Sequence, residues 1–226
     1  MVMKGNIALL KGKYFYLFIA LLSLLLLYPF FAGTVYGLVL LDSLFTVVLL
    51  FGIYAACKHK TTLIIALTLG LPALAGKWCS YFIDLPTLVL IGHIFAVLSF
   101  IFIIISILAQ VLRGKVVTTD TIYGAICVYF LIGIAWAFLY AAIETIHPGT
   151  FLIDQVPLNT TERKLPHFVY YSFVTLTSLG LGDISPATYI SRTVTYLEAI
   201  MGQFYMLILI ARLVGLHIAG SLNKGS

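Results

Sequence analysis

The sequence predicts an all-α membrane protein with six transmembrane helices and one shorter, re-entrant helix. Of its 226 residues, 62% are hydrophobic and only 9% are charged, whereas soluble domains carry about 25% charged residues. This number of charged side chains is too small to cover a surface that faces water. Most of the chain must therefore be surrounded by lipid. Its long apolar stretches lack the alternation of membrane β-strands. We therefore expect helices, which pair their backbone polar groups internally.

Six apolar stretches are separated by short polar or basic segments. The first follows three lysines and has no small-residue cleavage site behind it, so we expect it to stay in the protein as a helix. The third is expected to be short, because Gly70 and Pro72 interrupt it. The expected spans are residues 14–32, 35–56, 62–75, 86–112, 120–146 and 191–219.

The basic residues predict how the chain is oriented. Cytoplasmic loops of membrane proteins carry an excess of Lys and Arg. With the N-terminus in the cytoplasm, eight basic residues fall on the cytoplasmic side and four on the outer side. The eight are Lys4, Lys11, Lys13, Lys58, Lys60, Arg113, Lys115 and Lys224, and the four are Lys77, Arg163, Lys164 and Arg192. We therefore expect a multi-pass protein of the cell membrane with both termini in the cytoplasm.

A half-length helix is predicted between the last two spans. Residues 165–177 form an apolar run whose second residue, Pro166, suits the first turn of a helix. About a dozen helical residues extend roughly 18 Å, which is too short for a hydrocarbon core of about 30 Å. This helix is therefore expected to enter the membrane and stop inside it.

The segment after the short helix cannot continue it. Gly180 and Gly182 flank a leucine there, and glycine readily adopts positive φ angles. Alternating glycine and non-glycine residues can point successive carbonyl groups the same way, and a row of carbonyl oxygens can replace the water shell of a cation. We therefore predict a cation-binding strand at residues 178–183, with Tyr170, Tyr171 and Phe173 in an aromatic collar behind it.

Residues 175–183 read Thr-Leu-Thr-Ser-Leu-Gly-Leu-Gly-Asp. They resemble the signature of the potassium channel family, whose filter commonly reads Thr-Val-Gly-Tyr-Gly. By this resemblance Ser178 takes the Thr place, Leu179 the Val place and Leu181 the Tyr place, while Gly180 and Gly182 match. The resemblance covers about 100 residues, from the fifth span to the end of the chain. It implies a six-helix channel with a single pore loop, a re-entrant pore helix and a selectivity-filter strand.

The resemblance also implies roles for individual residues. The ion-binding filter residues would be Thr177, Ser178, Leu179, Gly180, Leu181 and Gly182, with K⁺ held at residues 178–181. Asp183 matches the acid that commonly follows the filter, and Tyr170 is expected to donate a hydrogen bond to it. Tyr171 would support the filter, and Glu144 would brace the back of the filter strand. The simpler alternatives are a plain loop acid or helix cap at Asp183 and an interfacial carboxylate at Glu144.

The last helix is expected to line the pore. Gly202 lies twenty residues beyond Gly182, where many relatives have a glycine hinge. A stripe at helical spacing would line a central cavity, and it consists of Gln203, Met206, Ile210 and Val214. The same helix carries Glu198 and Arg212. The simpler expectations for these two are interfacial exposure and contact with lipid phosphate, against a functional role.

Two domains are expected. Residues 117–226 would form the pore domain, and residues 1–116 a four-helix domain that resembles a voltage sensor. Six-helix channels carry their sensor in the fourth helix, as Arg or Lys at every third residue. No Lys or Arg occurs in residues 86–112. This domain is therefore expected to lack gating charges.

The sequence as a whole predicts a homotetrameric, K⁺-selective channel with weak or no voltage dependence. Four copies are required because one re-entrant segment supplies one wall of a filter. We expect K⁺ ions in the filter, membrane lipid around the tetramer, no other cofactor and no nucleic-acid partner. Three alternatives remain: a non-selective monovalent cation channel, which Leu181 allows, a Trk-like K⁺ transporter, or an accessory subunit. An enzyme is not expected, because no cluster of His, Cys and carboxylate residues has ligand or nucleophile spacing.

Overall fold

The computed structural model describes residues 12–31, 35–57, 59–83, 85–114, 118–153, 156–157 and 164–222. Six basic residues that enter the predicted orientation lie outside these ranges: Lys4, Lys11, Lys58, Lys115, Arg163 and Lys224. The chain divides into two compact units. One contains residues 1–64, 102–130 and 205–226, and the other contains residues 65–101 and 131–204.

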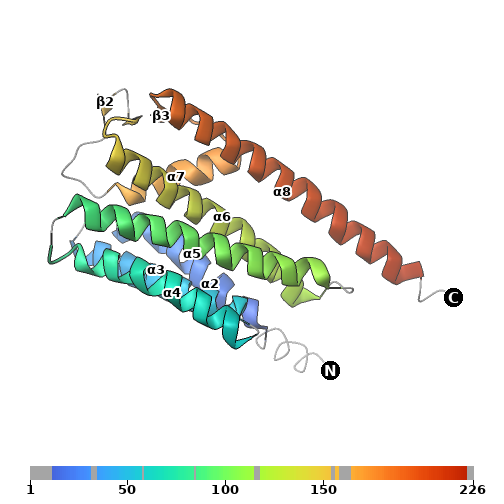
Figure 1. Cartoon of the computed structure of the whole chain (residues 1–226). Coiled ribbons are helices and arrows are strands. Elements are labelled where there is room, and N and C mark those ends of the chain that lie inside the picture. Colours follow the sequence, from blue (N-terminus) through green and yellow to red (C-terminus); the bar gives the residue numbers. More distant parts are fainter. Residues whose placement is uncertain are drawn as a thin grey trace. The chain divides into compact units, whose positions relative to one another are not determined.

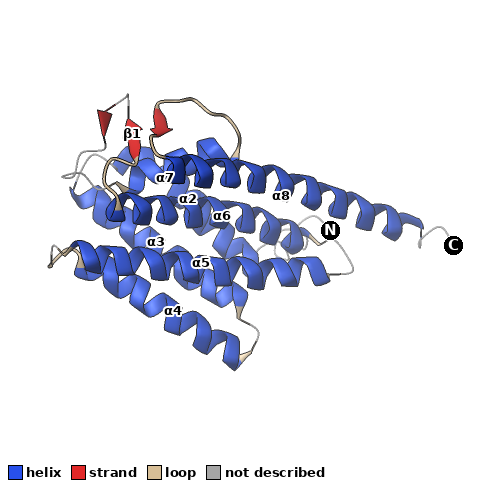
Figure 2. Cartoon of the chain, turned by 45° about the horizontal axis from the view of Figure 1, so that its top comes forward, coloured by secondary structure: helices blue, strands red, loops and turns tan. Residues whose placement is uncertain are grey.

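Helices dominate the described part of the chain (Figures 1 and 2). They are α2 (Lys13–Phe31), α3 (Val35–Ala56), α4 (Lys60–Cys79), α5 (Pro86–Arg113), α6 (Thr119–Ile146), α7 (Leu165–Leu176) and α8 (Tyr189–Leu222). Helices α4, α5, α6 and α8 each contribute residues to both units. Most bounds lie within a few residues of the predicted ones. The division into a four-helix domain and a pore domain stays a prediction.

The third predicted span was drawn too short. Helix α4 continues through Pro72 and ends at Cys79, four residues beyond the expected end at position 75. Its small residues explain how it persists, because they permit a close approach to a neighbouring helix. A Cβ atom added to Gly76 would lie 2.6 Å from the Cα atom of Gly92 in α5. Such packing offsets the hydrogen bond that a proline removes from a membrane helix.

Five helical stretches of the described residues are long and apolar enough to cross a membrane: Val39–Ala56, Lys60–Cys79, Pro86–Arg113, Thr119–Ile146 and Tyr189–Arg212. The apolar stretch Lys13–Leu27 in α2 is shorter. Helix α7 has 12 residues, which is too few to span a bilayer. The protein is thus a mostly helical, multi-pass membrane protein, and the full six-helix layout stays a prediction.

In the first unit, polar side chains hold the start of α2 against three other helices. The Lys13 ammonium donates to the carbonyl oxygen of Ala55 at 3.1 Å, and Gln110 of α5 donates to that of Ala56 at 3.0 Å. These two carbonyl groups lie in the last turn of α3, where carbonyl groups have no hydrogen-bond donor inside their own helix. The backbone N–H of Tyr14 donates to Asp120 of α6 at 3.2 Å.

The second unit contains a small antiparallel sheet, shown in red in Figure 2. Its strands are β1 (Phe151–Ile153), β2 (Val156–Pro157) and β3 (Ile184–Pro186), in the order β2-β1-β3. Leu152 pairs with Ser185 in the register of β1 and β3. The sequence analysis missed this sheet, because strands of two or three residues are too short to show an alternating pattern. The β1–β3 pair joins the segment after α6 to the residues just before α8.

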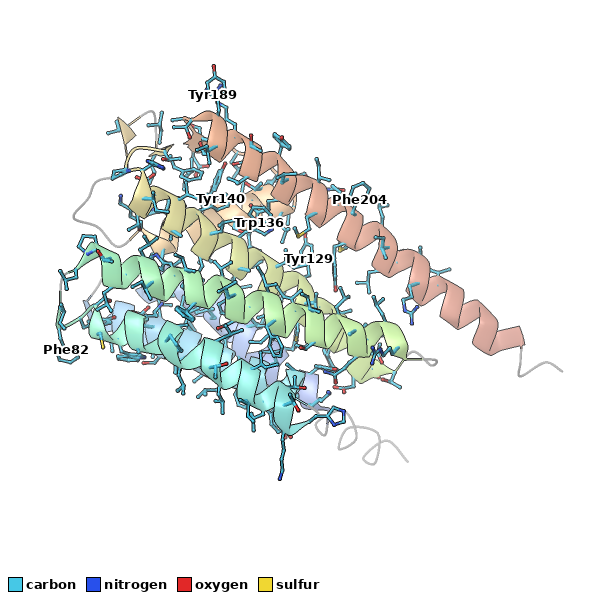
Figure 3. The ribbon with its side chains drawn as sticks, in the orientation of Figure 1. Phe82, Tyr129, Trp136, Tyr140, Tyr189 and Phe204 are labelled. Atoms are coloured by element: carbon cyan, nitrogen blue, oxygen red, sulfur yellow. The ribbon has the colours of Figure 1, made fainter. Side chains whose placement is uncertain are left out.

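An aromatic cluster lies under this sheet. Tyr140 of α6, labelled in Figure 3, is fully buried. Its ring centroid lies 5.2 Å from that of Phe151 in β1 and 5.1 Å from that of Tyr171 in α7, both edge-to-face. Phe151 also meets Phe168 of α7 at 5.1 Å. Edge-to-face pairs of this kind stabilise a packed core, and here they fix α7 against α6 and β1.

Candidate functional site

The end of α7 determines how the following segment begins. Helix α7 starts with a proline in its first turn and is capped at Thr177. The backbone N–H groups of the next residues turn back onto its last carbonyls. Thr177 donates to Phe173 at 3.1 Å, Ser178 to Thr175 at 2.8 Å, and Leu179 to Val174 at 2.9 Å. These bonds satisfy carbonyls that a helix end leaves open.

Residues 178–182 alternate in backbone conformation. The φ angles of Ser178, Gly180 and Gly182 are 58°, 60° and 83°, while Leu179 and Leu181 between them have no positive φ. The positive φ angles expected of the two glycines are thus confirmed. Ser178 is the one non-glycine residue with a positive φ among those described. Such an angle is uncommon for a residue with a Cβ atom, and it persists where surrounding contacts hold it.

The carbonyl groups of this segment are left without donors. Within the described residues, no hydrogen bond is made to a carbonyl oxygen of residues 177–182. The side chains are also uncovered, with Leu179 63% and Leu181 59% exposed. Backbone carbonyls are hard oxygen ligands of the kind that bind alkali cations. This segment therefore offers unpaired oxygens for a cation, in a single chain that does not enclose them.

Two of the predicted filter supports lie near each other. The Tyr170 hydroxyl interacts electrostatically with the Asp183 carboxylate, and the hydrogen bond expected between them stays a prediction. Tyr171 points elsewhere: it shares a hydrogen bond of 2.8 Å with Thr195 of α8, and its ring belongs to the aromatic cluster of Tyr140. Tyr170 thus lies near the residue that follows the segment, whereas Tyr171 fixes α7.

Glu144 binds residues of the segment that leads from α6 to α7. Its side chain is fully buried and accepts hydrogen bonds from the backbone N–H groups of Gly149 at 2.8 Å and Phe151 at 3.1 Å. It also pairs with Lys164, which caps α7, at 3.1 Å. An interfacial carboxylate is therefore the wrong description. These partners are not filter residues. Glu144 reaches the filter region through β1, which pairs with β3, and its bracing role stays a prediction.

Gly202 and Gln203 bring α8 against the end of α7. A Cβ atom at Gly202 would lie 2.2 Å from the carbonyl oxygen of Leu176, so no other residue fits there without movement. The amide of Gln203 donates to the Ser178 hydroxyl at 2.9 Å. Close packing thus gives a reason for glycine at position 202, and the hinge role stays a prediction.

The predicted cavity residues are all exposed on α8. Gln203 belongs to the second unit, and Met206, Ile210 and Val214 to the first. The same helix carries large exposed apolar side chains on other faces, including Leu207 and Ile208. Their exposure is therefore compatible with lining a cavity. It does not distinguish these four positions from the other exposed residues of α8.

Glu198 and Arg212 of α8 differ from the simple expectations. Glu198 is fully buried, in place of the expected interfacial exposure, and it contacts the hydroxyls of Tyr140 and Ser172. Arg212 donates to the carbonyl oxygens of Leu112 and Gly114 at the end of α5, the latter at 3.2 Å. The sequence held no signal for these contacts, because partners on other helices have no fixed spacing from either residue.

The described residues contain no group of three or more His, Cys, Asp or Glu side chains that could hold a metal ion. The backbone carbonyls of the segment after α7 are a different class of cation ligand, which needs no such group.

Comparison with known families matches an ion channel family to residues 149–217. Searches of curated proteins and of solved structures gave no match. The matched stretch contains the small sheet, α7, the segment with alternating φ angles and most of α8. Residues 149–217 thus match an ion channel domain, and this match indicates an ion channel of the membrane and not an enzyme.

Proposed function

We propose that this chain is one subunit of a homotetrameric channel that conducts K⁺ passively and selectively. The observation that carries the proposal is the backbone of residues 178–182. Positive φ angles recur there at every second residue, and the carbonyl oxygens accept no hydrogen bond within the described chain. The proposed ion ligands are the carbonyl oxygens of residues 178–181, with the Ser178 hydroxyl at the inner end.

Selectivity would arise from how these oxygens replace water. An ion must lose its hydration shell to enter a narrow filter, and a ring of carbonyl oxygens offsets that cost. Successive carbonyls must then face the same way, and the alternation of φ angles is the backbone conformation expected to achieve it. The N–H groups of residues 177–179 are already bonded to α7, which leaves their carbonyls as the polar groups available to an ion.

The exposure of the segment supports assembly from several copies. Non-helical backbone at membrane depth is tolerated only where protein buries it or water reaches it. In the single chain, Thr177 to Asp183 are all exposed, and a lipid surface would leave their carbonyls unsatisfied. Four copies around one axis would give each filter oxygen its equivalents and enclose a water-filled path. K⁺ ions, lipid and the other three copies are the proposed partners.

The four-helix part is proposed to lack voltage sensing. The basic residue of α5 is Arg113, in its last turn. A charge near the end of a membrane helix crosses little of the transmembrane field. Opening of the pore is therefore expected to depend weakly on voltage.

A non-selective cation channel is the second candidate, and Leu181 is the observation that favours it. In the potassium channel signature a Tyr stands here, and its hydroxyl ties the filter to the residues behind it. Leu181 has no hydroxyl and is 59% exposed. The electrostatic interaction of Tyr170 with Asp183 supports the selective alternative, because the proposed hydrogen bond between them would hold the same segment without a Tyr at position 181.

Single-channel recording from the purified protein in a planar bilayer tests whether it forms a pore. We expect unitary K⁺ currents from a tetramer, with subunit number checked by cross-linking. Gly180→Ala should abolish these currents, because a Cβ atom disfavours the φ of 60° at this residue. A protein that moves K⁺ without unitary currents would support the transporter alternative. A protein that alters currents only when another channel is present would support the accessory subunit.

A further inference from the structure

Glu198 connects three helices of the second unit from a fully buried position. It lies on α8, and its side chain has no solvent exposure. The hydroxyl of Tyr140 on α6 donates to one carboxyl oxygen, and the hydroxyl of Ser172 on α7 contacts the other. None of the filter oxygens is involved, so the conduction mechanism leaves this buried acid unexplained.

The hydrogen atoms around Ser172 limit the state of Glu198. The Ser172 hydroxyl lies 2.7 Å from the carbonyl oxygen of Gly133 on α6. A carbonyl oxygen carries no hydrogen, so this contact is a hydrogen bond only when the single hydrogen of the Ser172 hydroxyl lies between these two oxygens. The contact between Ser172 and Glu198 then needs a hydrogen from Glu198. Both contacts of the Ser172 hydroxyl can therefore be hydrogen bonds when Glu198 is a protonated carboxylic acid.

Within the described part of the chain, no cation pairs with Glu198 to balance an ionised carboxylate. Tyr140 of α6 and Tyr171 of α7 are the titratable groups that face it. Among the described residues, no Lys, Arg or His forms an ion pair with it. Glu144 on α6, which is also a fully buried acid of this unit, has Lys164 as its partner. A buried carboxylate without a cation is costly, whereas a neutral acid with both oxygens bonded is not.

We propose that Glu198 is a positioning residue for α7 that acts as a neutral carboxylic acid, donating to Ser172 and accepting from Tyr140. The proposal rests on the proposed function, because α7 carries the filter at its C-terminal end. Loss of the proton would force the Ser172 hydrogen toward the carboxylate and would leave the Gly133 contact without a hydrogen. The tie between α6, α7 and α8 would then weaken, and with it the position of the residues that precede the filter.

The protonation state can be measured without any current. Infrared spectra of the purified protein in lipid separate the C=O stretch of a protonated carboxyl from the bands of a carboxylate. At neutral pH we expect a protonated-carboxyl band that disappears in Glu198→Gln. The band should remain in the control Glu144→Gln, since Glu144 is paired with Lys164. A spectrum without any band that depends on Glu198 would overturn the proposal.

Currents test the positioning role. Glu198→Gln keeps one donor and one acceptor, so it should conduct like the wild type at neutral pH. The wild-type current should fall as pH rises, and the Gln variant should not follow it. Glu198→Ala leaves the Tyr140 and Ser172 hydroxyls unpaired and should lower the current at least about tenfold.

The control for these currents is Thr195→Val, which removes the uncharged hydrogen bond between α8 and Tyr171. It should keep the pH profile of the wild type. A Gln variant that retains the alkaline fall, or that loses its current as the Ala variant does, would refute the positioning role. If the wild type carries no current at all, the proposed function fails, and the infrared result still decides whether Glu198 is neutral.

Discussion

At the residue scale, Gln203 is the side chain that reaches the inner end of the filter segment. Its amide donates to the Ser178 hydroxyl at 2.9 Å, and Ser178 holds a φ of 58° that few non-glycine residues adopt. Gln203→Leu should therefore loosen Ser178 and lower the K⁺ over Na⁺ permeability ratio by about tenfold, the equivalent of one hydrogen bond. Met206→Leu, which removes no described hydrogen bond, is the control. Equal ratios in both variants would show that the amide does not hold the filter.

Gly202 provides a second prediction at the same scale. A Cβ atom there would lie 2.2 Å from a backbone oxygen of Leu176, whereas a Cβ atom at Gly215 of the same helix would meet nothing within 4 Å. Gly202→Ala should therefore destabilise the protein by about 1–3 kcal/mol, the usual cost of overpacking, and Gly215→Ala should not. Thermal unfolding in detergent measures both. A Gly202→Ala protein as stable as the control would contradict the close packing of α8 on α7.

At the element scale, the tie between α7 and the residues after the filter is the central contact. Tyr170→Phe and Asp183→Asn should each weaken the interaction between these two residues. We expect both variants to assemble as tetramers and to show altered inactivation or selectivity, because the tie acts on the filter and not on the helix packing. Size-exclusion chromatography and bilayer currents provide the two readouts. Unchanged currents from both variants would show that the interaction between Tyr170 and Asp183 does not act on the filter.

The elements that the sequence predicted well are those with strong local signals. Helix α7 was expected from an apolar run behind Pro166, and the alternating backbone from the spacing of Gly180 and Gly182. The sheet of β1, β2 and β3 escaped prediction because its short strands form through pairing of distant residues. The burial of Glu198 escaped for a related reason: its partners, Tyr140 and Ser172, lie 58 and 26 positions away in the chain.

At the scale of the whole molecule, we expect a channel whose opening depends only weakly on voltage. Residues 86–112 carry no Lys or Arg, and steep gating needs several charges in each subunit. The conductance–voltage curve in symmetric K⁺ should be shallow. Replacing Arg113 and Lys115 with Gln should leave it unchanged. A steep sigmoid that these replacements flatten would show that the first four helices do sense voltage.

The reversal potential under opposed K⁺ and Na⁺ gradients is the most direct test of K⁺ selectivity. With high K⁺ and low Na⁺ on one side of a bilayer and the reverse on the other, a filter made of the carbonyls of residues 178–181 should let K⁺ alone set the voltage. We expect a reversal potential close to the K⁺ equilibrium value. The control, Gly180→Ala, should give no current to measure. A reversal potential near zero under the same gradients would contradict K⁺ selectivity and would identify a non-selective cation channel.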